Sequence, residues 1–109
     1  MNTRIRTTPR FQADLDQFFD YIAQDKLEPA EQFLVVAKET LELLARYPFS
    51  GSRFRTAIKR LAGIRFYPMP SPYRSYLIFY KDSPEGIEAL TILHGATNLE
   101  SSLARAVSD

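Results

Sequence analysis

The fold of this protein is decided by one stretch, Tyr73-Arg74-Ser75-Tyr76-Leu77-Ile78-Phe79-Tyr80-Lys81. From Tyr76 to Tyr80 every residue is aromatic or aliphatic, and such residues favour strands. A short run of this kind is typical of a strand that is buried on both faces. We therefore expect it at the centre of the only sheet. Arg74 and Lys81 stand where this strand leaves the cover of the core, and they are the first indication of a functional surface.

The sequence on either side of this stretch predicts the rest of the sheet. Residues 64–69 form a second strand that ends at prolines, and the connection 68–72 contains three prolines, which cannot lie in a central ladder. Residues 82–86 are polar and predict a hairpin turn, followed by a strand over 87–94. Strict alternation would divide this last strand into one face with Ile87, Ala89, Thr91 and Leu93 and another with Leu90 and Ile92.

Outside these strands, the first half of the chain predicts one strand and two helices. Residues 4–7 alternate polar and apolar types, as a short strand does, and Thr8-Pro9 is a helix start with Thr8 as the N-cap. Apolar residues then recur at helical spacing, and polar residues take the opposite, solvent-facing side. The apolar stripe comprises Phe11, Leu15, Phe18, Phe19 and Ile22, and the solvent-facing side comprises Gln12, Asp14, Asp16 and Asp20.

A second helix is expected to begin at Pro29 and end at Arg46. Because only a short turn joins the two helices, they form an antiparallel hairpin. Val35 and Val36 widen the apolar stripe of the second helix, which is either a partner-binding groove or simply core. Residues 47–52 predict a loop and residues 53–61 an irregular segment or a short helical turn, while Asn98 caps a short terminal helix.

This order of elements predicts an α+β fold in a single domain over residues 1–109. An N-terminal strand and an antiparallel helical hairpin pack on a small, mainly antiparallel sheet, with a short C-terminal helix. A chain of 109 residues, 45% of them hydrophobic, has enough apolar surface for one core. There are no cysteines, which excludes disulfides and thiolate metal sites. No apolar run is long enough for a membrane span or a signal peptide, so we expect a soluble, cytoplasmic protein.

Charge is distributed unevenly although the net charge is only +1. Residues 1–42 carry eight acids and five bases, whereas residues 43–81 carry no acid. The eight bases of this acid-free segment are Arg46, Arg53, Arg55, Lys59, Arg60, Arg65, Arg74 and Lys81. Such a segment is either a solvated basic face or a surface that binds an anionic partner, and the complete absence of acids favours the second interpretation.

Few kinds of catalysis are open to these residues. The chain has one histidine, no cysteine and no glycine-rich phosphate loop, so we expect no metal and no cofactor. His94 is either structural or exposed at a strand end, and no serine stands in a nucleophile-elbow context. Metal-independent RNA cleavage remains open, because arginines and lysines stabilise a phosphorane while a tyrosine or histidine moves protons. The residues of suitable type are Arg65, Arg74, Lys81, Tyr73, Tyr76 and His94.

Several motifs give the chain a family resemblance. Beside the early amphipathic helix they are Tyr47-Pro48 followed by Gly51, Gly63-Ile64-Arg65, the run 76–80, and Ile92-Leu93-His94-Gly95-Ala96. With these motifs the chain resembles the RelE/ParE superfamily of toxins from bacterial type II toxin–antitoxin pairs, over nearly its whole length. The resemblance implies a compact α+β fold and a small antitoxin that wraps the toxin along its helical hairpin and sheet edge.

The superfamily has two branches that differ in mechanism. RelE-like members are ribosome-dependent messenger-RNA endonucleases with a late tyrosine or histidine, whereas ParE-like members are associated with poisoning of DNA gyrase. The ending His94-Gly95-Ala96 looks ParE-like, and no tyrosine follows Tyr80. Many ParE-like members have an arginine directly after this ending, where this chain has Thr97. The resemblance therefore implies a ParE-like gyrase inhibitor, a RelE-like nuclease as the alternative, or an attenuated toxin that is retained for complex formation.

These interpretations assign residues to roles. On the ParE-like interpretation no residue is catalytic, and the partners are a cognate antitoxin, in a possible heterotetramer, and DNA gyrase. The expected target contacts are Arg65, Arg74, Arg53, Arg55, Lys59, Arg60 and Tyr73. The expected antitoxin contacts are Phe18, Ile22, Phe33 and Leu34, each with a core role as its alternative. On the nuclease interpretation the partner is ribosome-bound messenger RNA, and Arg65, Arg74 and His94 are catalytic.

Overall fold

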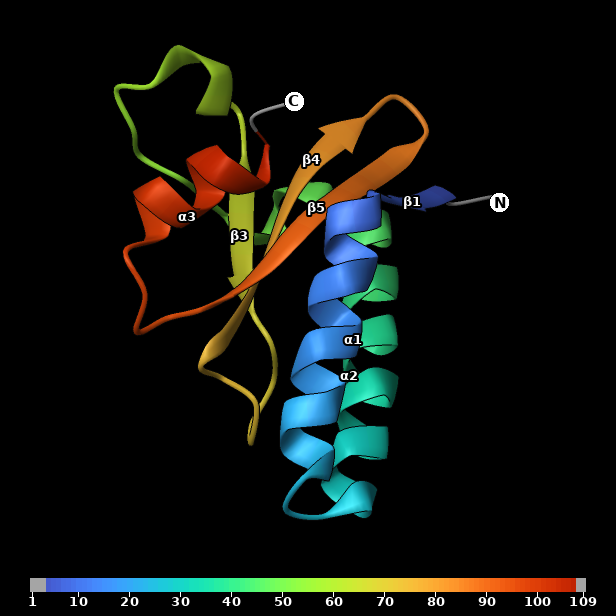
Figure 1. The fold of residues 1–109 in the computed structure, drawn as a ribbon. Coiled ribbons are helices and arrows are strands. Elements are labelled where there is room, and N and C mark those ends of the chain that lie inside the picture. Colours follow the sequence, from blue (N-terminus) through green and yellow to red (C-terminus); the bar gives the residue numbers. More distant parts are fainter. Residues whose placement is uncertain (1–3, 108–109) are drawn as a thin grey trace.

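The structure, a computed structural model, describes residues 4–107, and within them the chain forms an α+β fold as predicted (Figure 1). The five strands lie in the order β1-β5-β4-β3-β2. Their bounds are β1 Arg4–Thr7, β2 Ser52–Arg53, β3 Arg65–Pro68, β4 Tyr76–Ser83 and β5 Gly86–His94. The helices are α1 Pro9–Ala23, α2 Leu27–Arg46 and α3 Leu99–Ala106, with the 3-10 turns η1 Pro48–Ser50 and η2 Lys59–Leu61. No helix within residues 4–107 is both long and apolar enough to cross a membrane.

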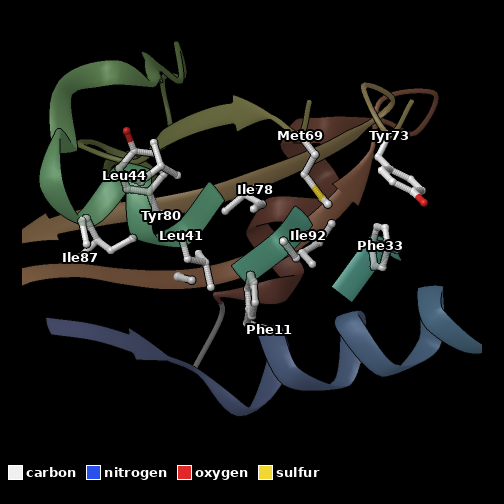
Figure 2. Packing of buried hydrophobic residues seen from close by; sticks show 13 residues of the cluster. Phe11, Phe33, Leu41, Leu44, Met69, Tyr73, Ile78, Tyr80, Ile87 and Ile92 are labelled. Atoms are coloured by element: carbon white, nitrogen blue, oxygen red, sulfur yellow. The ribbon is translucent and has the colours of Figure 1, made fainter. Parts of the chain in front are cut away.

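Strand β4 is the middle strand of the sheet, which confirms the prediction from its sequence. It pairs antiparallel with β3 and β5, and β1 joins β5 in parallel. Ile78 and Tyr80 face the helical hairpin, whereas Leu77 and Phe79 lie in a second cluster together with Leu103 of α3. The sheet is therefore covered by α1 and α2 on one face and by α3 on the other, and Figure 2 shows the larger of the two clusters.

The helix ends follow from local chemistry. Thr8 caps α1, because its hydroxyl accepts a hydrogen bond from the Phe11 N–H at 3.1 Å, and Asn98 caps α3 in the same way. Helix α2 begins at Leu27, earlier than the predicted Pro29. Pro29 lies in the first turn of α2, where a missing N–H costs no helical hydrogen bond. A proline is therefore tolerated at several positions of this turn, and Pro29 is not the first residue of the helix.

The predicted alternation of strand β5 is wrong in its second half. Between Phe79 and Tyr80 the register with β5 shifts, which leaves Leu90 without an opposite residue on β4, although its carbonyl accepts a hydrogen bond from the Thr8 hydroxyl at 2.9 Å. This β-bulge moves Ile92 to the same cluster as Ile87 and Ala89, and places Leu90 and Leu93 together in the other. One extra residue thus reverses the two faces of the strand.

Asp14 is not on the solvent-facing side of α1, as the helical period predicted, but buried with 8% of its surface exposed. Its carboxylate accepts hydrogen bonds from the Ile92 N–H at 3.1 Å and from the Thr91 hydroxyl, next to the bulge. Arg10 pairs with the other carboxylate oxygen at 3.3 Å. Because the bulge disrupts the ladder there, Asp14 supplies acceptors that the strands do not.

Two smaller differences concern strand lengths. Strand β4 begins at Tyr76 and not at Tyr73, because residues 73–76 form a turn in which the Tyr76 N–H donates to the Tyr73 carbonyl at 3.0 Å. The segment predicted as loop and irregular structure contains β2, which pairs with β3 through Ser52 and Arg53. A strand of two residues carries too little periodicity to be seen in a sequence.

Candidate functional site

Arg65 is the first residue of β3 and lies beside Tyr80, Phe49 and the backbone of Gly51. Across the strands it is opposite Tyr80 on one side and Arg53 on the other. Its guanidinium donates a hydrogen bond to the Gly51 carbonyl at 2.7 Å and lies 4.9 Å from the centre of the Phe49 ring. Arg65 is half-buried, and its hydrogen bond to Gly51 holds residues 47–51, the link between α2 and β2.

Tyr80, which is fully buried, holds the same link through its hydroxyl. The Tyr80 hydroxyl accepts a hydrogen bond from the Gly51 N–H at 2.9 Å and donates one to the Pro48 carbonyl at 2.6 Å. Burial raises the pKa of this hydroxyl, although the bond from Gly51 and the charge of Arg65 oppose the shift. A Cβ on Gly51 would lie 2.4 Å from the Tyr80 oxygen and 2.8 Å from the Phe66 carbonyl oxygen, so only glycine fits there.

Four further bases of the acid-free segment lie beyond Arg65, on β2 and the connection to β3. Arg53, Arg55, Lys59 and Arg60 are all exposed. Arg53 and Arg55 flank Phe54 in an open hollow of about 570 Å³, whose far side is formed by Ala62 and Gly63. Arg60 also donates to the Ala104 carbonyl at 3.0 Å, which ties η2 to α3. Arg53 thus lies beside Arg65 at the start of β3, whereas η2, with Arg60, packs toward α3 on the other face of the sheet.

Arg74 is not part of this group. It lies in the connection between β3 and β4, at the end of the sheet where Tyr76 pairs with His94. Tyr76 and Tyr80, the partner of Arg65, are four residues apart on β4, which corresponds to about 13 Å along the strand. Figure 2 shows the same separation, because Tyr73, the neighbour of Arg74, and Tyr80 lie at opposite ends of the cluster.

Tyr73 lies in the core and is not placed for contact with a target. Only 7% of its surface is exposed, its hydroxyl donates to the Pro29 carbonyl at 2.7 Å, and its ring packs edge-on against Phe33. Its role in the structure is to hold the start of α2 against the connection between β3 and β4.

His94 ends β5 beside a small aromatic pocket. Its ring packs edge-on against Tyr76 at 5.3 Å, and its Nδ1 accepts a hydrogen bond from the Ala96 N–H at 3.2 Å. Phe18 and Tyr21 of α1 complete the pocket, which has a volume of about 250 Å³. Burial raises the pKa of Tyr76, with smaller contributions from Tyr21 and Tyr73. His94 and Arg65 lie at different ends of the sheet, so Arg65, Arg74 and His94 do not converge.

The four residues expected to contact an antitoxin are more buried than exposed. Phe33 is fully buried, while Phe18, Ile22 and Leu34 are half-buried and pack against the core of the hairpin face. The large apolar side chains that the described residues do expose are Tyr21, Leu27, Val35, Leu43, Tyr47 and Phe49. Sequence reasoning missed most of these, although the widened stripe at Val35 and the aromatic residues beside Pro48 were signals for them.

No group of three or more histidine, cysteine, aspartate and glutamate side chains that could hold a metal ion comes together within residues 4–107.

Comparisons with known proteins place this geometry in context. The family model described as the ParE toxin of the type II toxin–antitoxin system parDE matches residues 5–99. Among solved structures, a chain from the "Chromosomal ParDE TA system from P. aeruginosa" is similar with a TM-score of 0.66 and 18% identity. That alignment covers 84% of this chain and 95% of the other, and at such low identity it bears on the fold alone. No curated protein matches.

Proposed function

The chain belongs to the ParE toxin family of type II toxin–antitoxin systems, and from this premise we propose that it inhibits DNA gyrase by direct binding and is neutralised by a cognate antitoxin. The observation that carries the proposal is the family match over residues 5–99, which runs from β1 to the start of α3. Because the match includes the helical hairpin and the whole sheet, it includes both surfaces on which the proposal depends.

The target surface in this proposal is the basic end of the sheet. Arg65 lies opposite the exposed Arg53 of β2, and the exposed Arg55 and Lys59 follow on the connection from β2 to β3. A concentration of positive charge steers an acidic partner and selects against basic ones. Arg60 contributes charge at the margin, and Arg74 would form a separate contact at the other end of β4. Tyr73 is left out, because its ring is buried.

The antitoxin surface in this proposal is the helical hairpin. Phe18, Ile22 and Leu34 keep part of their apolar surface exposed, which a partner segment could cover at small cost. Phe33 supports this surface from inside and does not reach it. We expect the toxin and antitoxin to associate in the cytoplasm, in a heterotetramer whose mass can be measured by light scattering.

The proposal is tested by gyrase supercoiling with the purified protein. The wild-type protein is expected to inhibit supercoiling, and added antitoxin to restore it. Arg53→Ala combined with Arg55→Ala should raise the concentration for half-inhibition about tenfold, since rim charges of this kind act mainly through association. Arg6→Ala is the matched control, because Arg6 is an exposed arginine on β1 at the other edge of the sheet.

Other results would favour another function. No inhibition of gyrase at saturating protein would refute the proposal. Ribosome-dependent cleavage of a message that is lost in Arg65→Ala or Arg74→Ala would instead establish the RelE-like nuclease. If induced expression without antitoxin leaves growth unaffected, the protein is an attenuated toxin, which agrees with Thr97 at the position where many ParE-like members have an arginine.

A further inference from the structure

Two of the most exposed apolar side chains in the described part of the chain are neighbours on one short link. Phe49 is 69% exposed and Tyr47 60% exposed, both in the link between α2 and β2, and Leu43 lies one helical turn before them. Single exposed apolar residues are common on protein surfaces, but two aromatic residues beside an arginine have the composition of a binding hot spot.

The backbone of this link is held in place, so the exposure of the rings does not come from a loose loop. Both polar groups of Gly51 are bonded, the N–H to the Tyr80 hydroxyl and the carbonyl to Arg65. The Pro48 carbonyl accepts a hydrogen bond from the Tyr80 hydroxyl, and the Ser50 N–H donates to the Tyr47 carbonyl at 3.0 Å. A partner that binds here orders little backbone, which lowers the entropic cost of association.

The charges around the link indicate the kind of partner. Arg65 covers one face of the Phe49 ring, Arg46 directly precedes Tyr47, and Arg53 lies opposite Arg65 on β2. The acids nearest in sequence are Glu42 on α2 and Asp82 on β4, which is two residues after Tyr80 and whose charge helps to raise the pKa of the Tyr80 hydroxyl. Since arginines outnumber acids here, a partner of opposite charge is favoured.

A protein segment fits this surface better than a nucleic acid does. Arg65 already occupies one face of the Phe49 ring, so a base could stack only on the other face. Leu43, one helical turn before Tyr47, is also exposed, and an aliphatic side chain suits contact with an apolar side chain of a protein.

We propose that Tyr47 and Phe49, supported by Arg65, are the anchor of the target surface and bind an acidic protein segment of gyrase that packs one apolar side chain against them. This inference rests on the proposed function and deepens it, because it names the specificity-determining residues and the chemistry of the segment that they recognise. The basic residues beyond β2 then contribute steering, and the two aromatic rings contribute affinity.

The test compares Phe49→Ala with the wild-type protein in the gyrase supercoiling assay. Phe49→Ala is expected to raise the concentration for half-inhibition by about 30-fold or more, as loss of a hot-spot aromatic residue does. Phe49→Tyr should stay within about threefold of wild type, because it keeps the ring. Tyr21→Ala is the matched control: Tyr21 is 67% exposed, nearly as much as Phe49, but lies outside the target surface near the end of α1.

Two further measurements separate the outcomes. Thermal melting of Phe49→Ala should match the wild type within about 2 °C, since the ring is mostly exposed, and its affinity for the antitoxin should change less than about threefold. Unchanged gyrase inhibition by Phe49→Ala would overturn the inference alone. An equal loss of antitoxin binding, or a loss of binding to DNA without gyrase, would also overturn it by assigning the surface to another partner. Failure of the wild-type protein itself to inhibit gyrase would overturn the proposed function and this inference with it.

Discussion

The hydroxyl of Tyr80 connects the core of this protein to the link that carries Phe49, and its removal tests that connection. In Tyr80→Phe the ring stays in the core and only the oxygen is lost. The oxygen makes two hydrogen bonds, one from the Gly51 N–H at 2.9 Å and one to the Pro48 carbonyl at 2.6 Å. The substitution therefore leaves one backbone donor and one backbone acceptor without a partner.

The expected cost follows from the burial of these two groups. Gly51 is buried, and an unsatisfied N–H there costs about 1–3 kcal/mol. Pro48 is half-buried, so water can replace part of its lost bond and the cost is about 1 kcal/mol. The sum is about 3 kcal/mol of unfolding free energy, which corresponds to a fall in Tm of about 10–20 °C in a domain of this size.

Thermal unfolding followed by circular dichroism measures this effect. Tyr73→Phe is the internal control, because it removes one hydroxyl that makes a single bond, to the Pro29 carbonyl at 2.7 Å, and should lower the free energy of unfolding by only about 1 kcal/mol. If Tyr80→Phe melts within 2 °C of the wild type, or if Tyr73→Phe costs more, the hydroxyl does not hold the link. If a stable Tyr80→Phe protein still inhibits gyrase fully, Phe49 can bind gyrase without the two hydrogen bonds that fix the backbone of Pro48 and Gly51.

Two other predictions concern the described core. Asp14→Ala should destabilise the protein by about 3 kcal/mol in urea unfolding, because the Ile92 N–H and the Thr91 hydroxyl lose their acceptor, and Asp14→Asn should cost less since its amide oxygen still accepts. The control is Asp16→Ala, at an exposed position on the same helix, which should change the free energy of unfolding by less than about 0.5 kcal/mol. Equal losses of stability at Asp14 and Asp16 would contradict the role of Asp14. Burial raises the pKa of Tyr80 in the folded protein above its value in the unfolded chain. The protonated hydroxyl therefore contributes its full free energy of unfolding below the ordinary tyrosine pKa, and this contribution is lost as the pH rises above about 10. The difference in Tm between the wild type and Tyr80→Phe should therefore narrow from pH 9 to pH 11, and a constant difference would mean that the hydroxyl does not titrate with folding.

The central position of β4 could be predicted from the sequence because its signal is local. Five consecutive apolar residues leave no polar side for solvent, so both faces must be covered, and a chain with one sheet has few places for such a strand. The caps at Thr8 and Asn98 were predictable for a similar reason, since the capping oxygen and the N–H that it accepts from lie within one turn.

The bulge in β5 was not predictable in the same way. Alternation assigns faces on the assumption that every residue pairs, and nothing in Leu90 itself shows that it is the unpaired one. The burial of Asp14 depends on that bulge, because the acceptor on α1 is needed only where the ladder is interrupted. The helical period of α1 alone could not show this, because the strand atoms that bond to Asp14 are distant in the sequence.

The separation of Arg65 from Arg74 depends on the direction of the strands and not on residue types. Arg65 begins β3, and Arg74 precedes β4 across a hairpin connection, so antiparallel pairing carries them to different ends of the sheet. Residue types alone grouped them with His94 as one candidate site. The short connection between β3 and β4 already implied antiparallel strands, and from that direction Arg65 could have been separated from Arg74 and His94.

Tyr80 shows how a family signature made of core residues bears on function. Leu77 to Tyr80 are buried and Tyr76 is half-buried, yet the last residue of this run holds Gly51 and Pro48, and thereby the backbone beside Phe49. A phenylalanine at this position would satisfy the core equally well by volume, since it differs only by the hydroxyl. The tyrosine is therefore explained by the link that it holds, and a strand that first indicates only the fold also determines how the proposed target surface is presented.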